Sequence, residues 1–371
     1  MKWQTASGGI HSDKNHAIMA AIGETLERYV GVICSFEVKK QNEIPNEKII
    51  AHNEFALFSE EQYKNPDFPW KIPNPNDAFF CKANSIYDNS EVYVPQELIG
   101  IGSRVSTHTL PSTSTGLAAH SGKLEALLSA TLEVLERDAL TVYWLNSFGG
   151  REIPLNKSFT YEVKKRHGEV YCFDITQSWN PFPVVIVCGF LYKEGIKRYS
   201  LGSACRPNLD DAVQKACSEW IQGCIFAGFY KEHHPDLDFK HISDVDSFDA
   251  HAVYYTIKPF DWDKTPLIIN KKTYKNPPEY NYFKDKTPAE SLEFLLRHLK
   301  QANIRFYYKN ITTRDVSNLG VCVIRVISPE LSLLHGDENM MFLGGKTHDK
   351  GWRYKGLKSG TFPNPYPHPL G

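Results

Sequence analysis

Apolar residues recur at three- and four-residue spacing in four long segments of the chain, which is the spacing of one helix face. This pattern predicts helices over roughly residues 13–33, 123–145, 209–226 and 287–304. Ser12 or Asp13 is expected to cap the first helix. Thr287 is expected to cap the fourth, in which Pro288 takes the first helical position.

Two regions have the pattern of strands. The apolar run PVVIVCGFLY, residues 183–192, predicts a buried strand, and residues 305–329 predict strand, loop and strand. Residues 65–80 and 229–285 are rich in proline, lysine or aromatic residues, so we expect loops there, with a short strand in the first. Helices and strands mix without regular alternation, which favours an α+β fold.

The composition limits the classes of protein. With 371 residues, 42% of them hydrophobic, the chain has ample material for the core of one large domain or two lobes. A net charge of −1 gives no overall field that would recruit nucleic acid or an anionic membrane. No apolar run approaches the roughly 20 residues of a membrane helix, and no secretory signal precedes the first helix, so we expect a cytoplasmic protein.

The cysteines and histidines show no metal-ligand spacing. The eight cysteines form no C-x-x-C pair, and most lie in apolar segments, which indicates buried, reduced thiols. The 14 histidines are dispersed without an H-x-x-x-H pair, so the sequence predicts no histidine-rich metal site.

The charged string E-x-x-E-R occurs in two of the predicted helices. Residues three and four apart share a helix face, so each string forms one charged stripe. The second helix is apolar on nearly all its other faces and should be buried, and an unpaired buried charge costs several kcal/mol. The stripes consist of Glu24, Glu27 and Arg28, and of Glu133, Glu136 and Arg137.

Two arrangements would satisfy these charges if the helices face each other. One is a salt-bridge network, which is the more common meaning of a single string. The other is one or more Mg²⁺ ions held by carboxylates, with the arginines on phosphate oxygens. Four carboxylates against two arginines leave two excess negative charges, which a divalent cation would neutralise. On the third helix, Glu219 and Gln222 form either a solvated face or further ligand contacts.

The C-terminal tail, residues 361–371, contains alternating prolines in the run PNPYPHPLG. Each proline fixes φ near −65°, which favours an extended polyproline II segment. Such a tail is usually disordered or an adaptor ligand. Alternatively, it presents the C-terminus rigidly to a pocket.

These motifs together resemble the YcaO family, ATP-dependent enzymes that modify peptide backbone amides. The segment S-x-x-x-E-x-x-E-R is met by Ser129 and the second string, and E-x-x-Q by Glu219 and Gln222. STGLAAH is similar to the family's S-T-x-G-x-A, and Arg325 lies in a strand similar to its R-V-x-x-P-x-L. The terminal P-x-P-x-P of the azoline-forming branch is carried by Pro365, Pro367 and Pro369.

The resemblance implies a single YcaO-type domain over residues 1–371, with mixed sheets and buried Glu-rich helices around a nucleotide site. It implies a cyclodehydratase in which Cys, Ser or Thr of a ribosomal precursor peptide attacks the preceding amide carbonyl. ATP phosphorylates the amide oxygen, and loss of phosphate leaves a thiazoline or oxazoline. Because the amide oxygen is a poor leaving group, the enzyme mainly positions and neutralises the phosphoryl group.

The resemblance also assigns roles to residues. The Mg²⁺ ligands would be Glu24, Glu27, Glu133, Glu136 and Glu219. The nucleotide contacts would be Arg28, Arg137, Gln222 and Arg325, and Ser129 would orient the cluster. In the tail, Pro365, Pro367 and Pro369 would order the active site, and His368 or the carboxylate of Gly371 would transfer protons.

Three departures from the family pattern affect these roles. The family's G-K-G aligns with Gly9, Ile10 and His11, so its lysine is missing, and Lys14 is out of register. Leu370 and Gly371 follow the last proline and displace the carboxylate. The chain begins close to the first motif, so we expect the leader peptide to be bound by a separate ThiF-like or ubiquitin-activating-enzyme-like partner.

The resemblance further implies that a flavin azoline dehydrogenase could complete the complex. We expect this chain to form a homodimer within it. Two alternatives remain. Another YcaO branch would form thioamides or macrocyclic amidines, and the proline tail argues against it. A non-catalytic peptide-binding or scaffold subunit is supported only by the missing lysine, and the carboxylates argue against it.

Overall fold

The computed structural model describes residues 9, 13–55, 57–72, 74, 78–102, 110–274, 280 and 283–371. The chain divides into two compact units, each with its own sheet and helices, which agrees with the α+β prediction. Unit 1 comprises residues 1–137, 286–333 and 343–346, and unit 2 comprises residues 138–285, 334–342 and 347–371. The division falls within helix α3, Lys123–Leu145.

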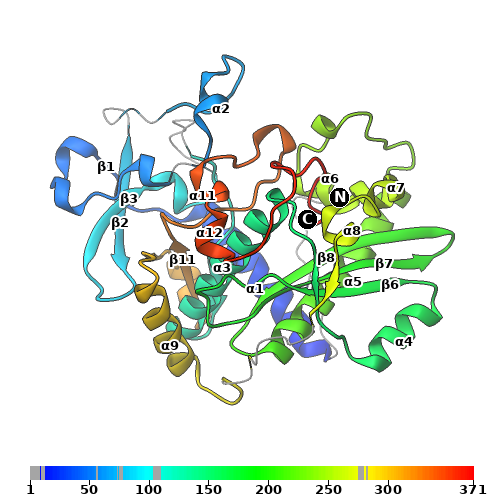
Figure 1. Ribbon diagram of the computed structural model, residues 1–371. Helices are drawn as coiled ribbons and strands as arrows, with labels where there is room; N and C mark the ends of the chain where they lie inside the picture. The colour runs from blue at the N-terminus through cyan, green and yellow to red at the C-terminus, as the bar shows by residue number, and fades with distance from the viewer. Residues whose placement is uncertain are drawn as a thin grey trace. The chain divides into compact units, whose positions relative to one another are not determined.

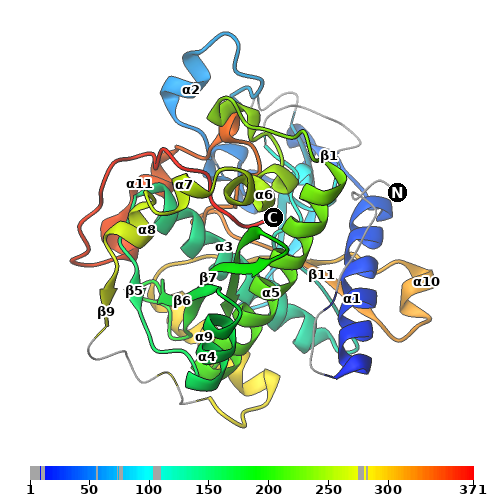
Figure 2. The ribbon, with the colours of Figure 1, turned by 90° about the vertical axis from the view of Figure 1, so that its right-hand side faces the viewer.

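Unit 1 is built on an antiparallel sheet with the strand order β1-β2-β10-β11-β4, and β3 pairs with β2. Helix α1 packs on β4 and β11 (Figure 2). The strands are β1 Lys39–Lys40, β2 Phe79–Ser85, β3 Glu91–Pro95, β4 Leu117–His120, β10 Tyr307–Asn310 and β11 Cys322–Ile327. The helices within this unit are α1 Lys14–Ile33, α2 Glu60–Lys64, α9 Pro288–Gln301 and α10 Arg314–Ser317, and α11 Gly345–His348 begins here.

The core of unit 1 lies under α1 and the central strands. Val30 of α1 packs in one cluster with Leu117 of β4 and Val323 of β11, and each is almost fully buried. Pairs such as Ile324 with Ala118 align β11 with β4 and fix the register. Both faces of β11 are buried between Val323 and Ile327, and a slip of one residue would move each of these side chains to the opposite face. The register therefore fixes which residues of β4 and β11 lie opposite each other.

Unit 2 is built on a sheet with the strand order β8-β7-β6-β5-β9, in which only the short β5–β9 pair is parallel. Helix α5 packs on β7 and β8, and α6 contacts both α5 and β8 (Figure 1). The strands are β5 Arg151–Glu152, β6 Glu169–Asp174, β7 Val184–Lys193, β8 Ile196–Cys205 and β9 Lys272–Thr273. The helices within this unit are α4 Lys157–Lys165, α5 Leu209–His233, α6 Phe248–Ile257, α7 Pro259–Trp262, α8 Pro266–Ile269 and α12 Lys350–Arg353.

Most predicted elements form where the sequence places them. Helix α1 begins after Asp13, whose side chain accepts a hydrogen bond from the backbone N–H of His16, while Ser12 lies outside the described residues. Thr287 caps α9 and forms a capping box with Glu290. The strand–loop–strand prediction corresponds to β10 and β11, with the short α10 in the loop.

The prediction of loops over residues 229–285 is wrong, because helix α5 continues to His233 and α6, α7 and α8 follow. Helix α6 is buried on nearly every side, so it lacks the polar face that reveals an amphipathic helix. Pro259 and Pro266 lie in this stretch, and each stands at the beginning of a short helix, where the missing N–H costs nothing.

The thiol prediction is confirmed. All eight cysteines lie within the described residues and are free, and six of them are buried. Burial raises the pKa of the Cys81 thiol to about 12, so this thiol stays protonated. None of the helices among the described residues combines the length and apolarity needed to cross a membrane.

A buried ion pair joins the second half of α3 to α12 within unit 2. The Arg353 guanidinium donates Nη2–H to Asp138 Oδ1 at 2.8 Å and Nε–H to Asp138 Oδ2 at 2.9 Å. Both side chains are almost completely inaccessible. Gln177 Nε2 also donates to Asp138 Oδ2, at 3.2 Å. Two parallel bonds and an amide donor satisfy a carboxylate that would otherwise be costly to bury.

We expect Arg353→Met to lower the free energy of unfolding by about 3–5 kcal/mol, because it leaves the Asp138 charge buried and uncompensated. Urea denaturation followed by tryptophan fluorescence measures the change. Arg297→Met, which removes an exposed pair with Glu293, is the control and should change stability by less than about 1 kcal/mol. Equal losses in the two variants would contradict the assigned role of the buried pair.

Candidate functional site

Helix α3 carries one charged stripe on its unit 1 half. Glu136 is buried, and Glu133 and Arg137 are half-buried, with 27% and 21% of their side chains exposed. Arg137 Nε lies 3.9 Å from Glu133 Oε1, and Arg137 Nη1 lies 3.7 Å from Glu136 Oε1. These distances are longer than hydrogen bonds. The guanidinium of Arg137 therefore lies between two carboxylates at ion-pair distance. Ser129, one turn earlier, is half-buried.

Among the residues of this stripe, Glu133 has a strongly raised pKa. Burial, together with the negative charges of Glu27 and Glu136, raises the pKa of Glu133 to about 8. Arg137 and Arg325 act in the opposite direction. The carboxyl group is therefore largely protonated at neutral pH unless another cation approaches it.

Helix α1 directs its two glutamates differently. Glu27 Oε1 accepts a hydrogen bond from the backbone N–H of Ala119 on β4 at 2.8 Å. Glu24 pairs with Arg28 at 2.7 Å, and Arg28 is more than half exposed. Of these two glutamates of α1, only Glu27 is among the charges that shift the pKa of Glu133. The two glutamates of α1 therefore have different surroundings, whereas the sequence suggested four carboxylates meeting in one cluster.

The segment STGLAAH leads into β4 and packs tightly on β11. Gly116 has φ +83°, and a Cβ there would lie 2.2 Å from the carbonyl oxygen of Val326. The backbone N–H of Val326 donates to Gly116 O at 2.7 Å. Glycine is required here both for its left-handed backbone and for the close contact. This contact holds the segment against the strand that carries Arg325.

Arg325 is the most buried cation of the site. Its Nε–H donates to Leu98 O at 2.6 Å, and its Nη2 donates to Thr113 O at 2.7 Å. Within the described part of the chain, its buried Nη1 has no hydrogen-bond partner. Burial lowers the pKa of Arg325 to about 10, and the charge of Glu133 opposes that shift. An unsatisfied guanidinium N–H beside a carboxylate cluster suits an anionic ligand.

Unit 1 thus brings five of the predicted residues into one electrostatic cluster. They come from α1, α3 and β11, which are far apart in sequence, and they are Glu27, Glu133, Glu136, Arg137 and Arg325. Glu24 and Arg28 pair with each other nearby on α1. Gly9 lies against α1, since a Cβ there would be 2.2 Å from Ala17 O, whereas Ile10 and His11 lie outside the described residues.

The third predicted helix lies in unit 2, on α5. Glu219 Oε1 pairs with Lys215 Nζ at 2.9 Å, and Glu219 Oε2 accepts from the backbone N–H of Ser203 on β8 at 3.2 Å. Gln222 is half-buried. This carboxylate therefore lies against β8, so it does not belong to a fully solvated face.

The donor set in unit 1 fits Mg²⁺ in its chemistry. Three carboxylates, those of Glu27, Glu133 and Glu136, offer hard oxygen ligands, and burial, with the two other carboxylates, holds the pKa of Glu133 above its usual value. Among the described residues, however, they do not form a group with ligand atoms within 4.8 Å of one another. The carboxylates would therefore have to move closer together to share one ion.

The proline tail is part of the packed structure of unit 2. Trp144 Nε1 donates to Tyr366 O, and the Tyr255 hydroxyl donates to Pro367 O, both at 2.7 Å. Pro367, His368 and the two following residues, Pro369 and Leu370, are buried, while Pro365 and Gly371 are exposed. The tail is therefore neither disordered nor a free adaptor ligand within unit 2. The sequence showed its prolines but not these contacts.

Among the described residues, a half-buried carboxylate cluster lies beside a guanidinium whose Nη1 has no hydrogen-bond partner, and this combination has the chemistry to bind a cation and an anionic ligand. The sequence matches, over residues 8–332, the family described as YcaO cyclodehydratase, ATP- and Mg²⁺-binding. Because the match covers most of the chain, this protein belongs to the YcaO family. The ATP and Mg²⁺ expected from the motifs are confirmed at the level of the family.

Solved structures support the same fold. A heterocyclase in complex with substrate and cofactor superposes with a TM-score of 0.76 at 17% identity, covering 96% of this chain and 49% of that chain. The E. coli microcin synthetase McbBCD complex with pro-MccB17 bound gives 0.62 at 19% identity, with 88% and 81% covered. YcaO from Methanopyrus kandleri, bound with AMPPCP and Mg²⁺, gives 0.63 at 16% identity, with 96% and 83% covered.

These similarities have limits. The chain spans about half the length of the first heterocyclase. The family match ends at residue 332, so it does not include the P-x-P-x-P tail. No curated protein sequence matches this chain.

We expect the Glu133 carboxyl to titrate near pH 8 in the metal-free protein. The measurement is ¹³C NMR of the protein labelled at the glutamate carboxyl carbon, with Glu133→Gln identifying the signal. Arg137→Met should raise this pKa further, because it removes the nearest positive charge. Arg297→Met, on the exposed face of α9, is the control and should leave the titration unchanged. A Glu133 titration near pH 4.5 would contradict the unbalanced cluster.

Proposed function

We propose that this protein is the ATP-dependent cyclodehydratase subunit that converts Cys, Ser or Thr of a ribosomal precursor peptide to thiazoline or oxazoline. The observation that carries the proposal is the Glu133 cluster, in which, among the described residues, three carboxylates from α1 and α3 lie with two arginines and the pKa of Glu133 is raised. Such a cluster suits a divalent cation and a polyphosphate, and the family description names ATP and Mg²⁺.

The proposed reaction loses one water equivalent per modified residue. The side-chain sulfur or oxygen bonds to the carbonyl carbon of the preceding amide, and the amide oxygen takes the γ-phosphoryl group of ATP. The attacking thiol or hydroxyl loses its proton as this bond forms. Phosphate then leaves with the former amide oxygen as the C=N bond of the azoline forms, the amide nitrogen releases its proton, and ADP remains. Because phosphorylation makes the poor leaving group a good one, the protein's task is chiefly to position charge.

The residues of unit 1 would divide this task. Glu27, Glu133 and Glu136 would hold Mg²⁺, which when bound neutralises the charge of the phosphates. Arg137 and Arg325 would bind phosphate oxygens, and the unsatisfied Nη1 of Arg325 is the donor best suited to that role. The roles of Glu24, Arg28, Ser129, Glu219 and Gln222 as further ligand contacts stay part of the proposal.

The tail would contribute to cyclisation through its fixed position in unit 2. Its contacts with Trp144 and Tyr255 hold the backbone around Pro367 rigidly. A rigid segment costs little entropy when substrate binds, which suits an element that lines a reaction site. Pro365, Pro369, His368 and Gly371 remain its candidate contributors.

A separate partner protein would present the precursor peptide. The related McbBCD assembly is a complex and binds pro-MccB17. We propose an analogous arrangement for this chain, with a ThiF-like or ubiquitin-activating-enzyme-like protein holding the leader peptide. A flavin azoline dehydrogenase would act on the product, and the chain would form a homodimer within the complex.

We expect Glu133→Gln and Glu136→Gln each to abolish ATP hydrolysis while the protein stays folded. At Glu133, glutamine mimics the protonated carboxyl that dominates at neutral pH in the metal-free protein, and at both positions it keeps the shape of the side chain while the amide is a poor Mg²⁺ ligand. Phosphate release and circular dichroism measure the two effects. Glu293→Gln, on the exposed face of α9, is the control. Normal hydrolysis in both site variants would refute the metal-site assignment.

The function itself is tested by mass spectrometry of a candidate precursor peptide incubated with this protein, its partner and Mg-ATP. We expect the peptide to lose one water mass per modified residue, with phosphate and ADP as the other products. Loss of water accompanied by a gain of sulfide would instead indicate a thioamide, and water loss between backbone amide and N-terminal amine an amidine. An unmodified peptide with all components bound would favour a scaffold subunit.

The same assay tests the tail. A chain lacking residues 363–371 should bind nucleotide but cyclise poorly, and near-ultraviolet circular dichroism checks that unit 2 keeps its packing. Full cyclisation by the shortened chain would remove the tail from the proposed site.

A further inference from the structure

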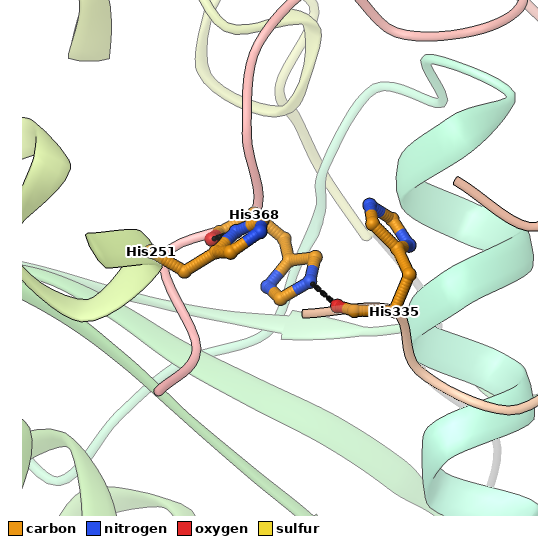
Figure 3. Close-up of side chains that lie close together, drawn as sticks. All are labelled: His251, His335 and His368. Atoms are coloured by element: carbon orange, nitrogen blue, oxygen red, sulfur yellow. Dashed lines mark hydrogen bonds between the residues drawn. The ribbon is translucent and has the colours of Figure 1, made fainter. Parts of the chain in front are cut away.

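Three buried histidines meet inside unit 2 although they are far apart in sequence. His251 lies on α6, His335 lies in residues 334–342, and His368 lies in the tail (Figure 3). Each offers a ring nitrogen, and these nitrogens lie within 4.8 Å of one another. Elsewhere among the described residues, no other group of three His, Cys, Asp or Glu ligand atoms comes this close.

Backbone carbonyls orient two of the rings. His251 Nδ1 lies 2.8 Å from the carbonyl oxygen of His368, and His368 Nε2 lies 2.7 Å from the carbonyl oxygen of His335. A ring nitrogen that faces a carbonyl must carry the proton, so the hydrogen-bond network assigns the lone pairs to His251 Nε2 and His368 Nδ1. In metal sites the ring nitrogen that does not bind the ion donates in the same way to a carbonyl or carboxylate, which fixes the ligating tautomer.

A buried carboxylate completes the group. Glu338 Oε1 lies 3.3 Å from His335 Nε2 and 3.6 Å from His251 Nε2, and the side chain is 3% exposed. Within the described residues, His251 Nε2 and His335 Nδ1 are buried without a hydrogen-bond partner. Unsatisfied buried nitrogens are costly, so their presence beside a buried carboxylate calls for an explanation.

We propose that His251, His335 and His368, with Glu338, bind one Zn²⁺ ion that fastens the tail to α6 and to residues 334–342. Imidazole nitrogens with a carboxylate are a donor set that suits Zn²⁺, and four protein ligands make a closed structural site. Because Zn–N bonds measure about 2.0–2.1 Å, tetrahedral ligand nitrogens lie about 3.4 Å apart. The side chains therefore need to close by at most about 1.4 Å from the separations seen here.

The arrangement of the rings shows what must change on binding. The His251 and His368 rings are stacked, with centroids 4.0 Å apart and planes inclined by 16°, while His335 is nearly perpendicular to both. To share one ion, the two stacked rings would have to turn about χ2 by a small amount that keeps their contacts with the carbonyl oxygens. Such a site is chemically distinct from the carboxylate and arginine cluster of unit 1, and it does not depend on the proposed function.

The test is metal binding by the full-length chain. The protein is stripped with a chelator, incubated with Zn²⁺, passed through gel filtration and analysed by plasma mass spectrometry. We expect one Zn²⁺ per chain and a higher melting temperature, because an ion that binds only the folded state stabilises it. Co²⁺ in place of Zn²⁺ should give the intense visible absorption of a tetrahedral site.

The variants are chosen to keep the carbonyl contacts. His251→Asn keeps a donor at the Nδ1 position and removes Nε2, and His368→Gln keeps a donor at the Nε2 position and removes Nδ1. Each should lose stoichiometric Zn²⁺ and the cobalt absorption. His52→Asn is the matched control, because His52 is also a buried histidine facing a buried carboxylate, that of Glu97 at 3.4 Å in unit 1.

Two outcomes would overturn the proposal. One is that the wild-type protein retains no Zn²⁺ and gives no tetrahedral cobalt spectrum. The other is that folded His251→Asn and His368→Gln bind Zn²⁺ as the wild type does. Should a histidine variant fail to fold, Glu338→Gln serves in its place, and the cobalt spectrum of the wild type still decides whether the site exists.

Discussion

The desolvation of Glu133 is the constraint on which the candidate site depends. A carboxylate placed on a largely buried helix must gain a counter-charge, stay protonated, or bind a cation. Arg137 and Arg325 supply only part of that counter-charge, since Glu27 and Glu136 act on the same group. Among the described residues, these arginines therefore do not offset the burial of Glu133, and a bound cation would do so.

The same helix provides the contrasting case. Asp138, five residues after Glu133 on α3, is at least as deeply buried, yet its two oxygens receive a bidentate guanidinium from Arg353 and an amide from Gln177. Nothing further is needed to stabilise it. Two acidic residues of one helix thus differ in environment, because described partners neutralise Asp138 while the pKa of Glu133 stays raised.

Local patterns explain what the sequence could predict. Glu24, Glu27, Glu133 and Glu136 were recognisable because i, i+3 spacing places charge on one face of an apolar helix. The caps at Asp13 and Thr287 follow from local chemistry in the same way. What the repeated string could not reveal is that its two copies are unequal. Glu24 pairs with Arg28 near the surface, while Glu27 turns toward β4, and that difference is set by the packing of α1 on the sheet.

Long-range contacts explain what the sequence could not predict. His251 and His368 are 117 residues apart and His335 and His368 are 33 apart, so no short motif joins them, and the dispersed histidines gave no sign of a cluster.

The convergence of these histidines bears on the role of the tail. His368 is buried, its Nε2–H donates to His335 O, and its ring stacks on His251. A side chain held in this way would have to break these contacts to carry protons, so its geometry suits an anchor, and the exposed ends of the tail at Pro365 and Gly371 are the parts left to face a substrate.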